Sequence, residues 1–205
     1  MNAVKCKIEH CCIVILAAGK SNRLGSPKQL LKYKGKSLLQ HAADAAIGTG
    51  LNPVFVITGA RTEMMEKELV NYPVQLIHNE SWEEGMASSI RCGVDAAESI
   101  KPDVDGILFM VCDQPFAETA VLNELIARQK ESGMPISACV YDDIIGTPAI
   151  YHKSIFPELM SLQGDIGAKK IINTHKDSLA TISFNSGKTD IDTASDYDNL
   201  LKTLN

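Results

Sequence analysis

Three basic side chains lie close together near the start of the chain: Lys20, Arg23 and Lys28 fall within nine residues. Small residues such as Gly19 precede or separate them, so backbone N–H groups in this stretch can approach phosphate oxygens closely. Because Arg and Lys neutralise phosphate charge, the combination indicates a site for a polyphosphate. A basic turn exposed to solvent is the alternative, since the spacing matches neither the P-loop motif nor the glycine fingerprint of dinucleotide-binding proteins.

A run of four apolar residues, Ile13–Leu16, leads directly into this basic segment. Three of the four are β-branched, which is typical of a strand buried on both faces of a parallel sheet. Gly19, Gly25 and Pro27 then predict a loop at the carboxyl end of the strand. Ligands of open α/β sheets bind at that end of the strands, so the basic segment is expected where a ligand would lie.

A second candidate is Asp113, which directly follows an apolar strand predicted over Ile107–Cys112. Carboxylates in this position commonly hold Mg²⁺, which proteins bind through one or two acidic side chains together with substrate phosphates. Asp192 follows another segment with apolar edges and is predicted as a second ligand. The alternatives are structural: Asp113 as a turn residue or helix N-cap, and Asp192 as the cap of the last helix.

The segment from Asn79 to Ser89 is polar and contains Trp82, the single tryptophan of the chain. Because it follows the third predicted strand, it is predicted to line a nucleobase pocket at the edge of the sheet. The alternative is that Trp82 covers the core while Ser88 and Ser89 open a helix. The five histidines show no metal-binding or triad spacing, and His41, on a predicted helix, is interpreted as structural.

Strands and helices alternate along the first two thirds of the chain, which predicts a doubly wound parallel sheet. Ser37 is expected to cap the first helix. Predicted strands lie at 13–16, 54–57, 74–77 and 107–112, with an extended piece at 29–31, and predicted helices begin at 38, 61, 86 and 118.

The last third departs from this alternation. Predicted strands at 136–141 and 149–151 follow each other without a helix, so at least one is expected to be antiparallel. Helices near 156–162 and 168–173, a strand at 179–184 and a helix from 195 complete the chain. We therefore predict one α/β domain over residues 1–205, three-layered and Rossmann-like, with a mostly parallel sheet.

Composition narrows the class of protein. The chain has 205 residues and a net charge of −5, which argues against a nucleic-acid-binding protein with a basic face. No apolar run reaches the length of about 18 residues that a membrane span needs, and the amino terminus lacks the pattern of a signal peptide. The six cysteines form no CxxC pair and are interpreted as reduced thiols of a cytoplasmic protein.

Several motifs resemble, in type and in order, those of the molybdenum cofactor guanylyl- and cytidylyltransferases, which are MobA-like NTP transferases. Residues 16–30 are similar to the signature LAAGxSxRxGxPKxL, and LAAG rather than LAGG resembles the CTP-using branch that serves xanthine dehydrogenase-type enzymes. Gly146-Thr147-Pro148 departs from the Gly-His-Pro that is usual in that branch, which leaves the acceptor open. The other matching segments, which extend the resemblance over nearly the whole chain, are 79–91, 112–115, 164–168 and 190–193.

The resemblance implies a fold of the nucleotide-diphospho-sugar transferase type and a magnesium-dependent reaction. The terminal phosphate of Mo-molybdopterin would attack the α-phosphorus of CTP, and pyrophosphate would leave. Arg23 would bind the β- and γ-phosphates, Lys28 the α-phosphate, and Asp113 with Asp192 the metal; Arg23, Lys28 and Asp113 are thus the predicted catalytic residues. The other implied contacts are Leu16, Ala17, Ala18, Gly19, Ser21, Asn79, Gly85, Ser88 and Ser89 for the nucleotide, and Gln114, Gly146, Thr147, Pro148 and Asp165 for the acceptor.

The resemblance also implies partners. Residues 1–115 would bind CTP with Mg²⁺ or Mn²⁺, and the remainder would bind molybdopterin. The protein is expected to act as a monomer in transient contact with a molybdenum hydroxylase, such as xanthine dehydrogenase, or its chaperone. Three alternatives stay open: nucleotidyl transfer from GTP or to another phosphorylated acceptor, a non-catalytic carrier of the cofactor, and an oxidoreductase of the Rossmann type.

Overall fold

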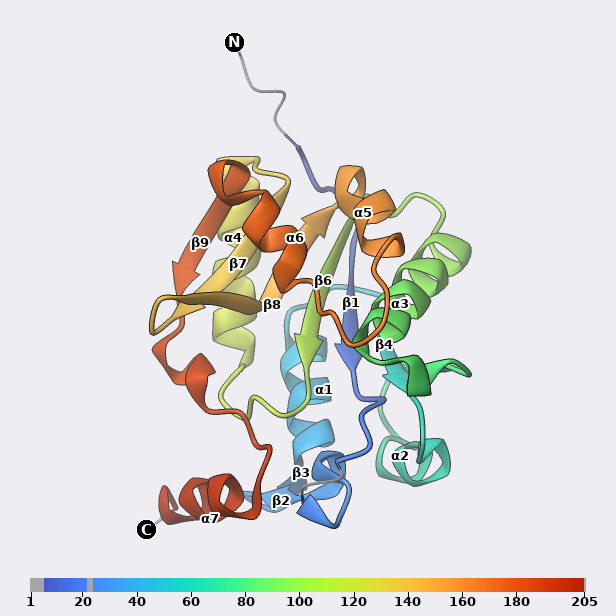
Figure 1. The fold of residues 1–205 in the computed structure, drawn as a ribbon, viewed down its shortest axis with the longest axis vertical. Coiled ribbons are helices and arrows are strands. Elements are labelled where there is room, and N and C mark those ends of the chain that lie inside the picture. Colours follow the sequence, from blue (N-terminus) through green and yellow to red (C-terminus); the bar gives the residue numbers. More distant parts are fainter. Residues whose placement is uncertain (1–5, 22–23, 205) are drawn as a thin grey trace.

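The computed structural model describes residues 6–21 and 24–204, which are built around a seven-stranded sheet in the order β5-β4-β1-β6-β8-β7-β9 (Figure 1). Only β8 runs against its neighbours, β6 and β7, and the other paired strands are parallel. This confirms the predicted sheet. The strands are β1 (Cys11–Leu16), β4 (Val54–Thr58), β5 (Gln75–His78), β6 (Gly106–Val111), β7 (Ile136–Tyr141), β8 (Ile144–His152) and β9 (Leu179–Ser183).

Helices cover both faces of the sheet, as predicted for a three-layer fold. In Figure 1, α3, α5 and α6 lie in front of the sheet, and α1 and α4 lie behind it. The α-helices are α1 (Leu38–Gly48), α2 (Thr62–Glu68), α3 (Met86–Ile100), α4 (Thr119–Ser132), α5 (Phe156–Met160), α6 (Lys169–Thr174) and α7 (Ala194–Lys202). Among the described residues, no helix is both long and apolar enough to cross a membrane.

The central strands contribute to the two larger hydrophobic cores, one on each face of the sheet. Along β1, Ile13 and Ile15 join the core under α1 and α4, whereas Cys12 and Val14 join the core under α3. Neighbouring residues of a strand point to opposite faces, so an uninterrupted apolar run suits a strand covered on both sides. Burial raises the pKa of the Cys12 thiol to about 12, so it behaves as a small apolar residue.

The chain after the basic segment differs from its prediction. The extended piece expected at 29–31 is largely a 3-10 helix over Lys28–Leu30, because Pro27 has the fixed φ of a helix start and its carbonyl accepts from the Leu30 N–H. A turn at Lys34-Gly35 then joins the two strands of a small hairpin, β2 (Lys32–Tyr33) and β3 (Lys36–Ser37). The other 3-10 helices are η3 (Trp82–Glu84), η4 (Lys153–Ile155), η5 (Lys176–Ser178) and η6 (Asn185–Lys188).

Ser37 caps α1 as predicted. Its hydroxyl accepts from the backbone N–H of Gln40, and the Gln40 side chain accepts from the Ser37 N–H, which completes a capping box. His41 is structural, as predicted: its Nε2 lies 2.6 Å from the carbonyl oxygen of Tyr33 in the hairpin. These contacts hold the hairpin against the start of α1.

Strand β8 is longer than the predicted 149–151. It spans Ile144–His152, so Thr147 and Pro148 lie within a strand and not in a connecting segment. Cys139 of β7 pairs with Gly146, whereas the preceding residue of β7 pairs with the residue after Pro148, and the ladder is therefore irregular. A proline has no N–H to give to a sheet, and an irregular position accommodates it.

Two buried hydroxyls among the described residues, those of Ser137 and Tyr151, have no hydrogen-bond partner. The Tyr151 side chain is about 1% exposed, packs edge-on against Phe109, and has no hydrogen-bond partner among the described residues. Leaving such a group unpaired costs about 1–3 kcal/mol. Tyr151→Phe should therefore raise the free energy of unfolding by about 1 kcal/mol, measured by urea denaturation.

The matched control is Tyr33→Phe. The Tyr33 hydroxyl is also buried but lies 3.2 Å from the Thr203 hydroxyl, so this variant should lose stability. Equal losses in the two variants would contradict the assignment of Tyr151 as unpaired.

Candidate active site

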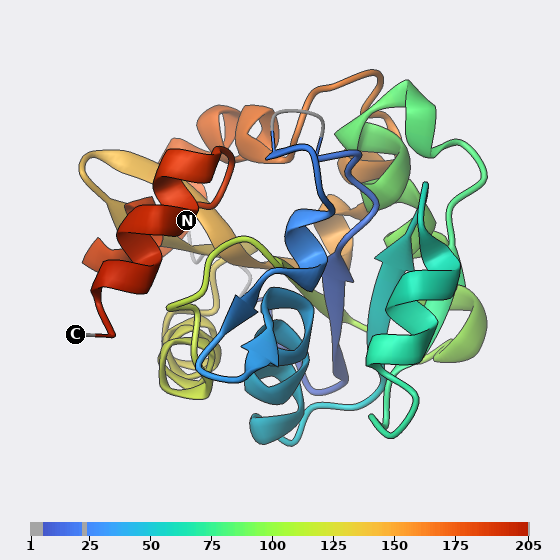
Figure 2. The ribbon, with the colours of Figure 1, turned by 90° about the horizontal axis from the view of Figure 1, so that it is seen from below.

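A cleft of about 750 Å³ opens at the carboxyl ends of β1 and β6, the edge of the sheet that Figure 2 looks onto. Its walls come from the loop after β1, the segment before α3, the end of β6 and the segment before α7. The structure brings most of the predicted site residues into its lining: Leu16, Ala17, Ala18, Gly19, Ser21, Lys28, Gly85, Ser89, Asp113, Gln114, Thr147, Asp165 and Asp192. Arg23 lies outside the described residues.

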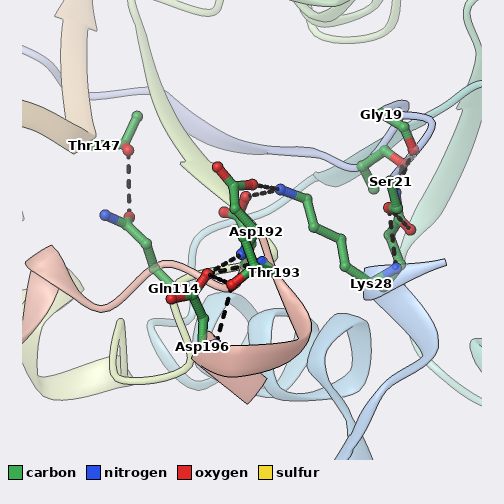
Figure 3. Close-up of polar contacts among 11 residues, drawn as sticks. Gly19, Ser21, Lys28, Gln114, Thr147, Asp192, Thr193 and Asp196 are labelled. Atoms are coloured by element: carbon green, nitrogen blue, oxygen red, sulfur yellow. Dashed lines mark hydrogen bonds and ion pairs between the residues drawn. The ribbon is translucent and has the colours of Figure 1, made fainter. Parts of the chain in front are cut away.

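Lys28, Asp113 and Asp192 form a charge cluster in this cleft. The Lys28 ammonium group donates a hydrogen bond to the Asp113 carboxylate, and its Nζ lies 2.8 Å from Asp192 Oδ1. Figure 3 shows Lys28 reaching across to Asp192. The Lys28 and Asp113 side chains are only 16% and 17% exposed, so water screens their attraction less than it screens a surface pair.

The pKa of Lys28 is raised in this setting. Burial by itself lowers it, but the Asp113 charge and the hydrogen bonds to Asp113 and Asp192 outweigh burial. Lys28 therefore stays protonated at neutral pH. Asp190 also lines the cleft, and partial burial together with the charges of Asp113 and Asp192 raises the pKa of its carboxyl group. This part of the cleft has an excess of negative charge that favours cations.

Asp192 is held toward the cleft because other residues cap α7. The Thr193 hydroxyl accepts from the backbone N–H of Asp196, and the Asp196 carboxylate accepts from the Thr193 N–H in return. The backbone of Ile191, which is fully buried, donates from its N–H to the Asp113 carbonyl oxygen at 3.0 Å. The alternative prediction, that Asp192 caps the last helix, is therefore wrong. The hydrogen bond from Ile191 connects the segment that carries Asp192 to the end of β6.

Gln29 positions the loop after β1. Its side chain is 1% exposed, and its Nε2 donates to the carbonyl oxygens of Ala17 and Gly19 at 2.8 and 2.9 Å. The Ser21 hydroxyl donates to Gln29 Oε1 and accepts from the Lys28 N–H. Gln29 therefore fixes the loop through two of its carbonyl groups, while the Ala17 N–H donates to the Ile57 carbonyl oxygen of β4.

Lys20 connects the loop after β1 to η3. Its Nζ lies 4.6 Å from the ring centroid of Trp82 and 3.2 Å from Glu83 Oε1. A cation over an indole ring is attracted by about 0.5–1 kcal/mol at an exposed site. Trp82 lines the cleft and is not a member of the hydrophobic cores. Of the two predictions for Trp82, the structure therefore favours the cleft position.

Asn79 and Ser88 lie outside the cleft lining. Asn79 is 5% exposed, and its Nδ2 donates to the hydroxyls of Ser88 and Ser89 at 2.8 and 3.1 Å. Its Oδ1 accepts from the backbone N–H of Ser81. Asn79 and Ser88 border a second, more open hollow of about 430 Å³. In the described structure Asn79 holds the turn before α3, and its contact with a nucleotide stays a prediction.

Gly85 and Asp165 meet at the rim of the cleft. Gly85 has φ of 120°, and a Cβ atom there would lie 2.7 Å from the Gly164 carbonyl oxygen, so only glycine fits. The N–H of Ala87 donates to that same oxygen at 3.1 Å, and the N–H of Met86 lies 3.4 Å from Asp165 Oδ1. The start of α3 thereby places Asp165 next to the cleft.

Gln114 and Thr147 form a neutral polar group at another part of the cleft. The Thr147 hydroxyl donates to Gln114 Oε1 at 3.3 Å, as Figure 3 shows, and Gln114 Nε2 donates to the Gly187 carbonyl oxygen at 2.8 Å. The neighbours of Thr147 in β8, Gly146 and Pro148, are not in the cleft lining. Only Thr147 of the Gly-Thr-Pro motif therefore reaches the cleft.

Gln29, Asp190 and Tyr141 are among the residues of the cleft lining that were not predicted as site residues. Gln29 and Asp190 stand next to predicted residues in their motifs, and that adjacency was the only available signal. Tyr141 lines the cleft from the end of β7. It could not be found from the sequence, because it joins the cleft through the pairing of β7 with β8.

The charge cluster fits a divalent cation. Two carboxylates from different segments already converge on one cationic atom, Lys28 Nζ, which marks a position where positive charge is stabilised. Within residues 6–21 and 24–204 there is no group of three or more His, Cys, Asp or Glu side chains that could hold a metal alone. Asp113 and Asp192 would therefore hold an ion together with oxygens of a bound phosphate, the pattern preferred by Mg²⁺.

Comparisons with known proteins place the chain among NTP transferases. Residues 13–179 match the family described as the MobA-like NTP transferase domain. The purine catabolism protein PucB of Bacillus subtilis is 31% identical over 206 residues, which cover 93% of this chain and 96% of PucB. The nicotine blue oxidoreductase of Paenarthrobacter nicotinovorans is 30% identical over 165 residues, which cover 76% of this chain and 78% of the relative.

A solved structure shares the fold over nearly its whole length. The crystal structure of Rv0371c from Mycobacterium tuberculosis has a TM-score of 0.80 and 29% identity, covering 96% of this chain and 99% of that chain. A second structure of the same protein, in complex with manganese, has a TM-score of 0.76 and 26% identity, with coverage of 95% and 99%. A protein of this fold therefore binds a divalent metal.

The charge cluster generates a stability prediction. Lys28→Met removes the shared counter-ion of Asp113 and Asp192, so the two carboxylates repel each other without compensation. We expect the variant to lose about 2 kcal/mol of stability in EDTA, and to regain much of it when Mn²⁺ is added. Thermal unfolding in EDTA and in Mn²⁺ measures both effects.

Lys36→Met is the matched control, because Lys36 forms an exposed ion pair with Asp44 outside the cleft. It should lose little stability and show no additional response to Mn²⁺ beyond that of the wild type. If Mn²⁺ does not stabilise the Lys28→Met variant more than the control, the charge cluster is not a metal site.

Proposed function

The chain belongs to the MobA-like NTP transferase family, and from this premise we propose that it transfers CMP from CTP to the terminal phosphate of Mo-molybdopterin. The products are molybdopterin cytosine dinucleotide and pyrophosphate. The observation that carries this proposal is the charge cluster of Lys28, Asp113 and Asp192 in a cleft of about 750 Å³. A cleft of this volume is large enough for small-molecule substrates.

In this proposal the nucleotide lies beside the loop after β1. Ala17, Ala18 and Gly19 line that side of the cleft, as does Trp82. Lys20 covers Trp82 in the described structure, so a base that stacks on Trp82 would take its place. Arg23 is proposed to bind the β- and γ-phosphates, on the motif alone.

Asp113 and Asp192 would hold Mg²⁺, or Mn²⁺ in its place, and the ion would neutralise charge on the triphosphate and on the leaving pyrophosphate. The manganese complex of the mycobacterial relative supports the use of a divalent metal. The two carboxylates come from segments that are tied together by the hydrogen bond from Ile191 to Asp113. Their separation is therefore set before any ligand binds.

Lys28 is proposed to stabilise the transition state. An ammonium group has three N–H donors, and the contacts with Asp113 and Asp192 use two of them. The third can meet an α-phosphate oxygen, which gains negative charge as the acceptor oxygen attacks phosphorus and the bond to the β-phosphate breaks. Such catalysis depends on position and charge and needs no covalent nucleophile on the protein.

The acceptor is proposed to bind at the side of the cleft opposite the loop after β1, against residues that follow Val111, the last residue of β6. Gln114 and Thr147 line this part, while Gly146 and Pro148 support Thr147 from within β8. Asp165, at the rim beside Gly85, is proposed as a further acceptor contact. The name of the Bacillus relative, a purine catabolism protein, supports a xanthine dehydrogenase-type enzyme as the recipient of the product. The chain would act as a cytoplasmic monomer that contacts this hydroxylase transiently.

The name of the Paenarthrobacter relative, an oxidoreductase, favours a second candidate function. A single screen separates the two. The purified protein is incubated with Mg²⁺, with each of the four NTPs, and with molybdopterin or a sugar phosphate, and pyrophosphate release is measured. In parallel, oxidation of NADH and NADPH is followed with the same protein. Pyrophosphate release that requires CTP and molybdopterin supports the proposal, and nicotinamide oxidation without pyrophosphate release overturns it.

Asp113→Asn should lower kcat for pyrophosphate release by about 100-fold or more, because a neutral amide is a poor Mg²⁺ ligand. The variant should also lose the effect of Mg²⁺ on CTP binding, measured by calorimetry. Asp103→Asn is the control, since Asp103 is exposed and lies outside the cleft lining. Near-normal turnover of Asp113→Asn would remove Asp113 from the metal site.

Lys28→Ala should lower kcat by about 100-fold while changing the Kd of CTP by less than about threefold, since the lysine meets charge that develops only in the transition state. Single-turnover kinetics and calorimetry separate the two quantities. A loss of CTP affinity as large as the loss in kcat would instead assign Lys28 to ground-state binding.

A further inference from the structure

Tyr141, the last residue of β7, is fixed firmly at the cleft. Its ring packs edge-on against Phe184, with 6.4 Å between ring centroids and 87° between ring planes. A Cβ atom on Gly187 would lie 2.7 Å from the Tyr141 ring, so this glycine also makes room for it. Ring orientation is therefore set by packing on both sides, and the side chain lines the cleft.

The Tyr141 hydroxyl lies in a space that its neighbours leave open. The side chains of Gln114 and Thr147 lie beside it and partly offset the effect of burial on its pKa. A Cβ atom on Gly146 would lie 2.5 Å from the hydroxyl oxygen, so a glycine at this position keeps the place open. Partial burial raises the pKa of Tyr141, so the hydroxyl stays protonated and able to donate at neutral pH.

The two ends of the cleft differ in the charged side chains that line them. Among the described residues in its lining, only Lys20 and Lys28 are cationic, and both come from the first part of the chain. The Lys20 ammonium group lies over the Trp82 ring, and the Lys28 ammonium group contacts Asp192 within the charge cluster. Gln114 and Thr147 beside Tyr141 are neutral, and the Asp190 carboxylate adds negative charge there, so this end of the cleft suits an uncharged hydrogen-bonding ring better than a second phosphate.

We infer that Tyr141 is a specificity-determining residue for the acceptor: its hydroxyl, which lies beside Gly146 at the Thr147 end of the cleft, forms a hydrogen bond with an uncharged ring atom of that substrate. This inference rests on the proposed function, because it presumes that an acceptor binds at this end of the cleft. It adds a residue that no motif comparison marks, and it explains why Gly146 precedes Thr147.

The test is Tyr141→Phe, which removes the hydroxyl and keeps the ring. KM for molybdopterin should rise about fivefold, as expected for the loss of one neutral hydrogen bond, while KM for CTP stays within about twofold. Calorimetric binding of molybdopterin should weaken by a similar factor. Tyr72→Phe is the matched control, because Tyr72 does not line the cleft, and it should leave both constants unchanged.

Gly146→Ala provides a second variant that displaces the hydroxyl without removing it. Its added methyl group would collide with the hydroxyl oxygen, so it should reproduce the acceptor effect of Tyr141→Phe.

The outcomes separate the inference from the proposed function. If the wild type releases pyrophosphate with molybdopterin but Tyr141→Phe keeps the wild-type acceptor KM, the inference is wrong and the proposed function stands. Equal increases in both KM values also overturn the inference, because they indicate a general distortion of the cleft. If the wild type releases no pyrophosphate with any acceptor, both fail.

Discussion

Two carboxylates that approach each other within a partly buried cleft need a cation between them, because their mutual repulsion otherwise disfavours ionisation of both. This constraint organises the carboxyl edge of the sheet. Asp113 closely follows β6, Asp192 precedes α7, and Lys28 from the region after β1 contacts both. The cluster thus joins parts of the chain that lie up to 164 residues apart. In the proposed reaction, Lys28 and the metal supply the positive charge that these carboxylates require, and the same positive charge neutralises the triphosphate.

Neutral hydrogen bonds fix the parts around these charges. Gln29 uses its amide to bind two carbonyl groups of the loop after β1, and Gln114 uses its own amide to connect Thr147 to the backbone at Gly187. The two glutamines therefore hold opposite ends of the cleft, one beside the proposed nucleotide and one beside the proposed acceptor. Such preorganisation matters for a reaction that depends on position, because a displacement of about 1 Å can cost about 100-fold in rate.

Local patterns predicted much of this arrangement, and non-local pairing accounts for the rest. The apolar run before Ala17 predicted the central strand and the place of the loop after it. The choice for Asp192 could not be made from sequence, because Thr193 is an equally good cap and only the fold shows which residue caps α7. The cleft position of Tyr141 depends on an irregular pairing of β7 with β8, which no local pattern records. Arg23 lies outside the described residues, and its role stays a prediction.

The central claim is that this cleft transfers the α-phosphoryl group of CTP, with its nucleoside, to a phosphorylated acceptor. It is tested most directly by following two labels in the wild-type protein with Mg²⁺ and molybdopterin: ³²P in the α-position of CTP in one reaction, and ³²P in the γ-position in another. The account predicts that the α-label appears in a molybdopterin dinucleotide and that the γ-label appears in pyrophosphate. A γ-label transferred to the acceptor, or an α-label that stays in CTP, would contradict it.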